Sequence, residues 1–367
     1  MERFFPTGIA KKASAFSGGT MRAVFFRRFG GPEVLEEGDL PTPEPARGEV
    51  RLRVLATALN HLDVWVRSDP SEIPLPHVGG SDVVGVLDAV GRGVRLPLGV
   101  RGVLNPSLSC GRCPSCRRGE WSLCDAFGIL GSETKGGLAE YLVAPARNFV
   151  RVPSTVRDET AAAYPLVGLT AYRMLVTKGR LRPGETVLIH GAGGGLSSIA
   201  VPIARALGAR VFATSGGPEK TAKAKRLGAH LAIDYTREDV LERVREATSG
   251  KGVDLVLENV GQATFATSVK ALRKGGRIVT AGATTGGVFP VDIGDLYWRQ
   301  LAILGSTMGG PREFAAVSRL VFSGKVRPAI DRVRPLTQED VRGGHADLEK
   351  GVQFGKIVFR VASESTR

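Results

Sequence analysis

All four cysteines of this 367-residue chain lie in one short window, with the spacing C-x2-C-x2-C-x7-C: Cys110, Cys113, Cys116 and Cys124. Thiolates this close in sequence can converge on one tetrahedral zinc ion at about 2.3 Å, and a closed four-sulfur site is structural rather than catalytic. The window has glycines and prolines but no apolar periodicity, so a metal is needed to fold it. Two disulfides would need an oxidising compartment, and an iron–sulfur cluster would prefer a different last spacing. We predict one structural zinc ion per chain.

Length and composition narrow the class of protein to which this chain can belong. A chain of 367 residues with 43% hydrophobic residues and 48 glycines favours two α/β domains, each with a core. Its 50 basic and 36 acidic residues give a formal net charge of +14. The basic residues are dispersed, so nucleic acid is not the expected partner. No apolar run reaches the roughly 20 residues that span a bilayer. We expect a cytoplasmic protein without a membrane partner.

Two kinds of strand pattern divide the chain. Alternating apolar residues at 22–26, 49–56 and 83–90, between turns rich in proline and glycine, indicate an antiparallel, barrel-like domain. From Thr186 the pattern becomes continuous apolar strands that alternate with helices, which predicts a doubly wound parallel sheet. Strands are expected at 186–189, 209–214, 253–257, 277–281 and 301–305, with helices up to 207 and at 219–227 and 263–272. Residues 1–20 lack the apolar core of a secretion signal, and we expect a mobile tail there.

A glycine cluster follows the strand predicted at 186–189. It lies between a strand and a helix, the context that a dinucleotide fingerprint requires. Glycines there let the backbone approach a pyrophosphate, whose charge rests on the helix N-terminus. The strict G-x-G-x-x-G spacing is not met, and a glycine-rich turn without a ligand is the alternative. The flanking pattern favours a cofactor site at Gly193, Gly194, Gly195 and Leu196.

The end of the next strand indicates which dinucleotide is bound. An NAD enzyme places Asp or Glu there to bind the ribose 2′-hydroxyl. This chain has Thr214 and Ser215 followed by two glycines, with no acid before Glu219. Hydroxyl groups and the nearby Lys220 would accept a 2′-phosphate. We therefore predict that the cofactor is NADPH.

Several stretches resemble, in their order and spacing, the medium-chain dehydrogenase/reductase superfamily. They are the cysteine window with residues 105–109 before it, and residues 58–63, 79–82, 168–171 and 304–308. The resemblance runs from Met21 to about Val361 and is closest to the alcohol dehydrogenase/quinone oxidoreductase-like branch. It implies a GroES-like catalytic domain over 21–165 with a zinc lobe at 105–130, a Rossmann domain over 166–309, and a return of 310–367 to the first domain.

The resemblance also implies further cofactor contacts. Ser197 stands where the fingerprint has its last glycine. Tyr235 matches a tyrosine that lies over the 2′-phosphate, and Thr170 matches the residue that touches the nicotinamide. The remaining positions expected at the cofactor are Asn60, Asn259, Gly282 and Ser306.

Zinc alcohol dehydrogenases of this superfamily hold a second, catalytic zinc with two cysteines and a histidine. Carried over by resemblance, these ligands fall at Asn60, Ser81 and Leu166, none of which is a competent zinc ligand. His61 and His77 lie near in sequence and could form a substitute site. Two histidines without a third ligand more often pack or make polar contacts. We predict that the structural zinc is kept and the catalytic zinc is lost.

The expected activity follows from the missing Lewis acid. Hydride transfer is then easier to an activated C=C bond or a quinone, whose developing charge needs only hydrogen-bond donors. Asn60 is the expected donor, Thr170 lies at the nicotinamide, and His61 and Trp65 complete the catalytic candidates. Trp65 stands where related reductases carry a tyrosine, so solvent or Tyr164 is left as the proton source. The alternatives are an aldehyde/alcohol dehydrogenase with a non-standard metal site, or a dinucleotide-dependent RNA-binding protein without turnover.

The apolar run Leu301–Gly305 points to an assembly. An exposed strand of this kind invites pairing with a second copy across a two-fold axis. The resemblance implies a homodimer or homotetramer built on this strand, acting on a small-molecule substrate. An interior strand covered by the C-terminal segment is the alternative.

Overall fold

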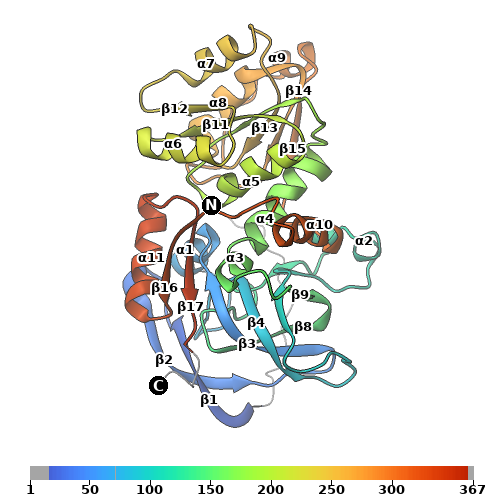
Figure 1. Ribbon diagram of the computed structural model, residues 1–367, viewed down its shortest axis with the longest axis vertical. Helices are drawn as coiled ribbons and strands as arrows, with labels where there is room; N and C mark the ends of the chain where they lie inside the picture. Colours follow the sequence, from blue (N-terminus) through green and yellow to red (C-terminus); the bar gives the residue numbers. More distant parts are fainter. Residues whose placement is uncertain (1–15, 71, 363–367) are drawn as a thin grey trace. The chain divides into compact units, whose positions relative to one another are not determined.

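The computed structural model describes residues 16–70 and 72–362, and the chain divides into two compact units (Figure 1). The first unit takes the chain up to Leu166 and adds Gly309–Ser318 and the chain from Ile330 onward. The second unit consists of Val167–Met308 and Arg319–Ala329. The sequence placed all of 310–367 with the first domain, whereas residues 319–329 group with the second unit.

The first unit is built on a seven-stranded sheet of order β16-β17-β3-β4-β5-β9, with β8 paired to β3. Its central strand alternates as the sequence predicts, because Val50, Leu52 and Val54 are buried on one face. The strands are β3 (Glu49–Ala58), β4 (Asp82–Val90), β5 (Arg101–Leu104), β8 (Tyr141–Pro145), β9 (Phe149–Arg151), β16 (Ile330–Pro335) and β17 (Lys356–Arg360).

A two-stranded antiparallel hairpin precedes this sheet. It consists of β1 (Phe16–Phe26) and β2 (Leu35–Pro43), and its buried side chains share a core with α11 (Gln338–Lys350). Because β1 begins at Phe16, residues 16–20 belong to a strand and not to the tail expected over 1–20. Residues 1–15 lie outside the described residues.

The register of three neighbouring strands gathers polar side chains from distant parts of the chain. In the antiparallel pairs, Ala58 of β3 lies opposite Val358 of β17 and opposite Asp82 of β4. Continued two residues beyond the end of β3, the same register places Lys356 opposite Asn60. Asn60 is also the N-cap of α1 (His61–Ser68). One end of the sheet thus receives polar side chains from β4, β17 and the start of α1.

The second unit is a six-stranded parallel sheet of order β12-β11-β10-β13-β14-β15, with helices on either side (Figure 1). This confirms the predicted Rossmann-type sheet. Its strands are β10 (Thr186–Ile189), β11 (Arg210–Ser215), β12 (Leu231–Asp234), β13 (Val253–Glu258), β14 (Leu272–Thr280) and β15 (Ala302–Gly305). Its helices are α5 (Gly195–Ala206), α6 (Pro218–Arg226), α7 (Val240–Ala247), α8 (Gln262–Ala271) and α9 (Ile293–Trp298).

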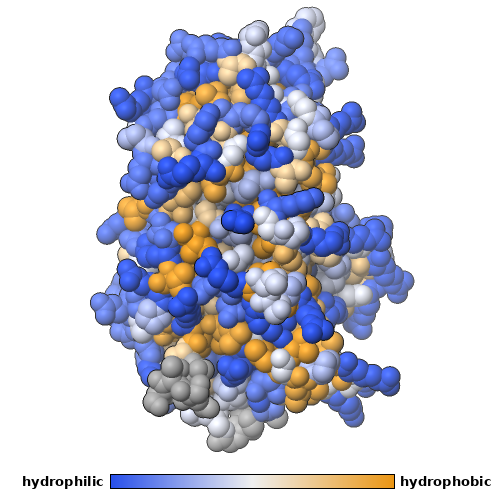
Figure 2. Space-filling view, in the orientation of Figure 1, coloured by the Kyte–Doolittle hydropathy of each residue, from blue (hydrophilic) through white to orange (hydrophobic). Residues whose placement is uncertain are grey.

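The remaining helices, strands and turns of the described chain are as follows. They are α2 (Pro114–Arg117), α3 (Asp158–Ala162), α4 (Pro165–Tyr172), α10 (Pro311–Phe322), the π-helix Arg173–Lys178, β6 (Ser107–Leu108), β7 (Gly128–Ile129) and three 3-10 turns at 32–34, 121–123 and 146–148. None of the helices in the described ranges has the length and apolarity needed to cross a membrane. Hydrophilic side chains are spread over the visible face of each unit, with apolar ones between them (Figure 2).

Candidate functional site

The four cysteines converge in the lobe around α2. All four sulfur atoms lie within 4.8 Å of one another, and the Cys110 and Cys116 sulfurs are 3.9 Å apart. Four sulfurs at 2.3 Å from a central zinc would be about 3.8 Å apart, so the cluster has the dimensions of a closed tetrahedral site. Backbone N–H groups of Cys113 and Cys116 donate to sulfurs of the cluster at 3.3 and 3.4 Å. Such donors favour the thiolate form that a metal requires.

The four thiols do not ionise alike. Backbone N–H groups of Arg112 and Cys113 lower the pKa of Cys110 to about 6, whereas burial raises the pKa of Cys124 to about 12 beside the sulfurs of Cys110 and Cys116. Burial thus opposes ionisation of the Cys124 thiol, and a bound cation would favour the thiolate form of all four cysteines. Among the described residues, this is the one group of three or more Cys, His, Asp or Glu side chains placed to hold a metal ion.

A buried polar cluster lies where the resemblance places the catalytic zinc. Lys356 Nζ donates to Asn60 Oδ1 at 2.5 Å and to Asp82 Oδ2 at 2.8 Å. Asn60 Nδ2 donates to the same Asp82 oxygen at 3.0 Å. The exposed fractions are 2% for Lys356, 0% for Asp82 and 5% for Asn60. A buried ammonium of this kind requires its carboxylate partner, because either charge alone would be strongly unfavourable.

The three positions at which the resemblance places zinc ligands have other contacts or offer no metal ligand. The backbone N–H of Leu166 donates to Asp82 Oδ1 at 2.6 Å, so this position holds the carboxylate and offers no metal ligand. Ser81 is fully buried, and its Oγ has no partner among the described residues. The remaining position, Asn60, already binds both Lys356 and Asp82. An amide, a hydroxyl and an alkyl side chain around a fixed ammonium do not fit a divalent zinc ion.

Asp63 organises the backbone next to this cluster. Its two carboxylate oxygens accept the N–H groups of Asn60 and Gly80, each at 2.7 Å. Burial raises the pKa of Asp63 to about 6, although these two hydrogen bonds act in the opposite direction. The carboxyl group thus ties the start of α1 to the loop before β4.

The other catalytic candidates of the first unit have mostly packing roles. His61 and Trp65, one turn apart on α1, are in edge-to-face contact with ring centroids 5.1 Å apart, and burial lowers the pKa of His61. His77 is buried against Phe26, and its Nε2 lies 3.1 Å from Gly131 O; burial lowers the pKa of His77 to about 4. The structure does not combine His61 and His77 in a group with a third metal-binding side chain.

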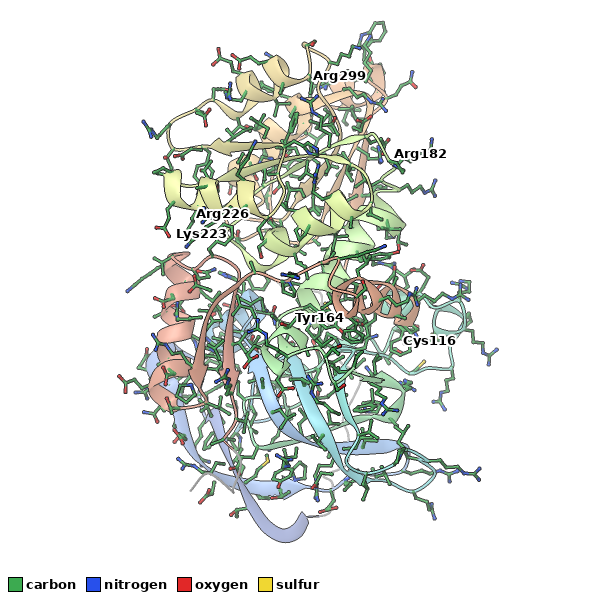
Figure 3. All side chains as sticks on the ribbon, viewed as in Figure 1. Cys116, Tyr164, Arg182, Lys223, Arg226 and Arg299 are labelled. Atoms are coloured by element: carbon green, nitrogen blue, oxygen red, sulfur yellow. The ribbon has the colours of Figure 1, made fainter. Side chains whose placement is uncertain are left out.

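Tyr164 does not fit a role as proton source. It is fully buried, stacks on Phe314, and its hydroxyl lies 2.8 Å from Ser318 Oγ (Figure 3). Burial raises the pKa of this phenol. The tyrosine therefore packs on the part of α10 that belongs to the first unit, and the interpretation of Tyr164 as a proton donor is not supported.

In the second unit, the glycine cluster forms the turn from β10 into α5. Gly191 has a φ of +64°, and the half-exposed residues Gly193, Gly194, Gly195 and Leu196 bring the chain to the first turn of the helix. The first N–H groups of an α-helix lack intrahelical partners and favour a bound phosphate. Ser197 is buried, and its Oγ donates to His190 O at 2.5 Å. Serine at this position therefore fastens α5 to β10.

The end of β11 differs in part from the expectation. Thr214 Oγ1 accepts the Gly191 N–H at 3.2 Å, and Ser215 Oγ lies 3.0 Å from Thr221 Oγ1. Both residues are at most 2% exposed, so their hydroxyls serve the fold and are not displayed to a 2′-phosphate. Tyr235 is exposed and covers Gly216, because a Cβ at this glycine would lie 2.7 Å from the tyrosine Oη.

Lys220 is half-buried on α6, the helix that carries Lys223 and Arg226 (Figure 3). The helix follows the two glycines after β11, and its first basic residue is Lys220, after Pro218 and Glu219. Of the residues expected at the 2′-phosphate, Thr214 and Ser215 are buried, whereas Lys220 is half-buried and Tyr235 is exposed.

Two of the other residues expected at the cofactor, Asn259 and Ser306, have buried polar atoms without partners among the described residues. Asn259 donates from Nδ2 to Ser197 Oγ at 3.0 Å, but its Oδ1 is buried without a partner among the described residues. Ser306 Oγ, just after β15, is also buried and unpartnered within the described chain. Gly282 follows β14, and a Cβ there would lie 3.0 Å from Asn259 O. Thr170 on α4 donates to Met308 Sδ at 3.5 Å.

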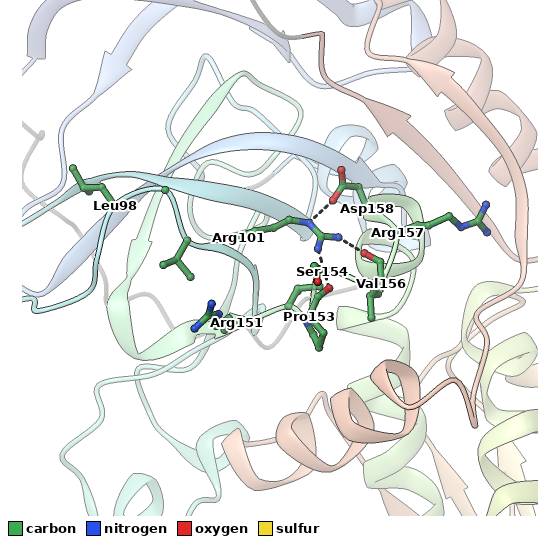
Figure 4. Close-up of a pocket in the computed structure, with 11 residues that line it drawn as sticks. Leu98, Arg101, Arg151, Pro153, Ser154, Val156, Arg157 and Asp158 are labelled. Atoms are coloured by element: carbon green, nitrogen blue, oxygen red, sulfur yellow. Dashed lines mark hydrogen bonds and ion pairs between the residues drawn. The ribbon is translucent and has the colours of Figure 1, made fainter.

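A separate depression of about 1000 Å³ lies on the first unit, between the β5 end and the chain before α3 (Figure 4). Arg101 ties its wall together through Asp158, Pro153 O and Val156 O. The Arg157 side chain points away from Arg101 in Figure 4. None of the predicted site residues lines this depression.

Sequence reasoning missed Lys356 and Asp82. Each carries a signal that could have found it, because a charged residue begins a strand whose other residues are almost all apolar: Lys-Ile-Val-Phe in β17 and Asp-Val-Val in β4. Such a charge is buried only with a partner. What the sequence could not supply was the identity of that partner.

Comparison with known proteins agrees with this architecture. Two family profiles match: the alcohol dehydrogenase GroES-like domain over residues 46–154 and the zinc-binding dehydrogenase family over residues 195–323. An alcohol dehydrogenase of Geobacillus stearothermophilus is 32% identical over 345 residues, covering 93% of this chain and 100% of the relative. A quinone oxidoreductase of Rattus norvegicus is 29% identical, covering 92% of this chain and 97% of the relative.

A solved structure of an NAD-dependent alcohol dehydrogenase superposes with a TM-score of 0.89 at 47% identity, covering 93% of this chain and 100% of that one. Similarity therefore extends through both units, and it includes relatives that act on alcohols and relatives that act on quinones. The cysteine cluster fits the zinc binding of this family. The chain belongs to the medium-chain dehydrogenase/reductase superfamily and is an oxidoreductase built from a GroES-like unit and a Rossmann unit.

Proposed function

We propose that the protein is an NADPH-dependent reductase of small molecules with an activated C=C bond or a quinone ring, working without a catalytic zinc. One observation carries this proposal: the Lys356 ammonium is held between Asn60 Oδ1 and Asp82 Oδ2, at the place of the zinc ligands. A fixed cation there repels a second, divalent cation at close range. Hydrogen-bond donors, and not a metal ion, are then left to stabilise an oxygen that becomes negative.

Reduction of an activated C=C bond by NADPH requires only that the chain stabilise a negative oxygen. Bound NADPH supplies a hydride. The β-carbon of an enone would accept it, the C=C electron pair would form a new double bond between the α-carbon and the carbonyl carbon, and the C=O electron pair would move to the oxygen. Water would then protonate the α-carbon of the resulting enolate. The chain's part is to stabilise the negative oxygen, for which oriented donors are sufficient. An unactivated alcohol is a poor substrate here, because its oxygen must lose a proton during oxidation and no metal ligand set is present to stabilise the alkoxide.

The preference for NADPH rests on Lys220 and Tyr235. No acidic side chain ends β11, where an NAD enzyme would bind the ribose hydroxyl groups. The ammonium of Lys220 would give the 2′-phosphate a charge-assisted contact, and the exposed Tyr235 ring would cover it. The orphaned Asn259 Oδ1 and the Ser306 Oγ would bind the carboxamide of the nicotinamide.

The four-cysteine lobe would hold one structural zinc ion, as its tetrahedral dimensions indicate. For the assembly we propose a homodimer or homotetramer. The strand β15 ends its sheet, and the neighbouring α9 displays Ile293, Tyr297 and Trp298 at 73%, 69% and 74% exposure. Large apolar side chains beside an unpaired strand edge suit a second copy of the chain.

Alcohol or aldehyde oxidation is the second candidate, and the similarity to alcohol dehydrogenases favours it. A substrate panel separates the two. Cyclohex-2-enone, 1,4-benzoquinone, an aldehyde and ethanol are tested with NADPH or NADP⁺, before and after a chelator that strips open metal sites. We expect enone or quinone reduction that survives chelation. Activity lost on chelation and restored by added zinc would support the second candidate, with His61 and His77 as the first ligands to examine.

A further inference from the structure

Three groups at the end of the first unit's sheet form a closed hydrogen-bonded ring. Lys356 bridges Asn60 Oδ1 and Asp82 Oδ2, and Asn60 Nδ2 completes the ring by donating to the same Asp82 oxygen. An ammonium only donates and a carboxylate only accepts. The amide of Asn60 therefore has one possible orientation, with its oxygen toward Lys356 and its nitrogen toward Asp82.

The ring leaves one donor unused. The amide nitrogen has two hydrogens, and the one that bonds Asp82 lies on the same side as Oδ1, because Lys356 contacts both oxygens. The second hydrogen points away from Lys356. Among the residues that the structure describes, no acceptor pairs with this hydrogen.

The rest of the fold holds this ring in place. Leu166 N–H fixes the other oxygen of Asp82 at 2.6 Å, and Asp63 Oδ2 fixes the backbone of Asn60 at 2.7 Å. Lys356 and Asp82 are at most 2% exposed, so the ion pair is far better suited to orient a neighbour than to meet a substrate itself. Asn60, at 5%, is the most exposed member of the ring.

We propose, resting on the proposed function, that Lys356 and Asp82 are positioning residues that lock the Asn60 amide so that its free N–H donates to the carbonyl oxygen of the substrate. The substrate group recognised is accordingly a hydrogen-bond acceptor that gains negative charge, as in an enone or quinone. Lys356 strengthens this donor because its positive charge withdraws electron density from the amide oxygen. Asp82 prevents the Asn60 amide from flipping, because its carboxylate oxygen accepts from the amide Nδ2 and cannot accept from Oδ1.

The test is a double-substitution cycle on the full chain, with saturating NADPH and cyclohex-2-enone or 1,4-benzoquinone. Asn60→Ala should lower kcat roughly 10²- to 10³-fold, as removal of one oxyanion donor does. Lys356→Met should lower kcat roughly 10- to 100-fold with little change in the KM for NADPH, the loss expected for one charge-assisted hydrogen bond. In the Asn60→Ala background, Lys356→Met should cost nothing further. The exposed Lys350 on α11 supplies a matched control, since Lys350→Met should leave kcat unchanged.

The outcomes are distinct. Losses that multiply in the double variant would show that Lys356 acts independently of Asn60 and would overturn the proposal, as would a normal kcat in Lys356→Met. If Lys356→Met does not fold, Lys356→Met with Asp82→Asn removes both charges together, and the same lack of further loss in the Asn60→Ala background is expected. If the wild-type protein turns over only alcohols or aldehydes, the proposed function fails; the cycle is then run on that substrate and decides the positioning role by itself.

Discussion

The sharpest stability prediction concerns His345, a buried histidine on α11. It is 1% exposed, and neither ring nitrogen has a partner among the described residues. Burial lowers its pKa to about 3, and the positive charge of Arg67 on α1 acts in the same direction. Arg67 itself pairs with Glu349, and no carboxylate among the described residues hydrogen-bonds either nitrogen of His345. The native state therefore requires a neutral imidazole at this position.

The proton linkage of His345 determines how the free energy of unfolding changes with pH. An unfolded histidine has a pKa of 6.5, so between pH 6.5 and pH 3 the unfolded state binds a proton that the native state does not. The stabilisation is fully present above pH 6.5 and is lost as the pH falls toward 3. From these two pKa values, lowering the pH from 7 to 5 should cost about 2 kcal/mol of unfolding free energy through His345 alone.

The measurement compares wild type with His345→Leu in urea at pH 7 and pH 5. Tryptophan fluorescence reports on the first unit through Trp65 and Trp121 when Trp298→Phe silences the second unit. The wild type should lose about 2 kcal/mol more than the leucine variant between the two pH values. Equal losses in both proteins would refute the claim that His345 is held neutral, whatever the leucine variant does to stability at pH 7.

Three further predictions follow from the other sites. Metal analysis should give about one zinc per chain, and Cys116→Ser should remove it and lower Tm; two zinc ions per chain would contradict the empty catalytic position. Lys220→Ala should weaken NADPH binding roughly 10- to 100-fold without affecting NADH, whereas Lys223→Ala, on the same helix but paired with Glu219, should change neither; equal affinity for both cofactors in the wild type would count against the argument. Light scattering at micromolar concentration should show a dimer or tetramer that Trp298→Glu weakens, and a monomer of 38.9 kDa in the wild type would reject the assembly.

The second unit could be predicted well because its central strands, β10, β11 and β13, are almost wholly buried. The run at 186–189 is continuously apolar and ends in glycines, and β10 has those same bounds. The edge strand β12 was missed because it has only four residues and its apolar run ends at Asp234. The helix α7 was missed as well, although Val240, Leu241, Val244 and Ala247 have helical spacing and pack on the core.

The four-cysteine cluster could be predicted from the sequence, whereas the hydrogen-bonded ring around Lys356 could not. The cysteine cluster was predictable because its four sulfurs come from one short window of the sequence and all suit the same metal ion. The ring around Lys356 was not, because it depends on the register of β17 on β3 and on partners that are 274 and 296 positions away. The hydroxyls of Thr214 and Ser215 have the right chemistry for a phosphate, but strand alternation and burial direct them into the fold.

The distance along the chain between Asp82 and Lys356 affects how the protein is made. A ribosome adds roughly 5–20 residues per second, so about 14 to 55 s separate the synthesis of the two residues. During that interval β4 and β3 can pair, but β17 does not yet exist and the Asp82 carboxylate has no ammonium. Almost all of the second unit emerges in between and can fold first. The GroES-like unit is thus begun before the Rossmann unit and completed after it, when a late strand brings the charge that allows its interior to close.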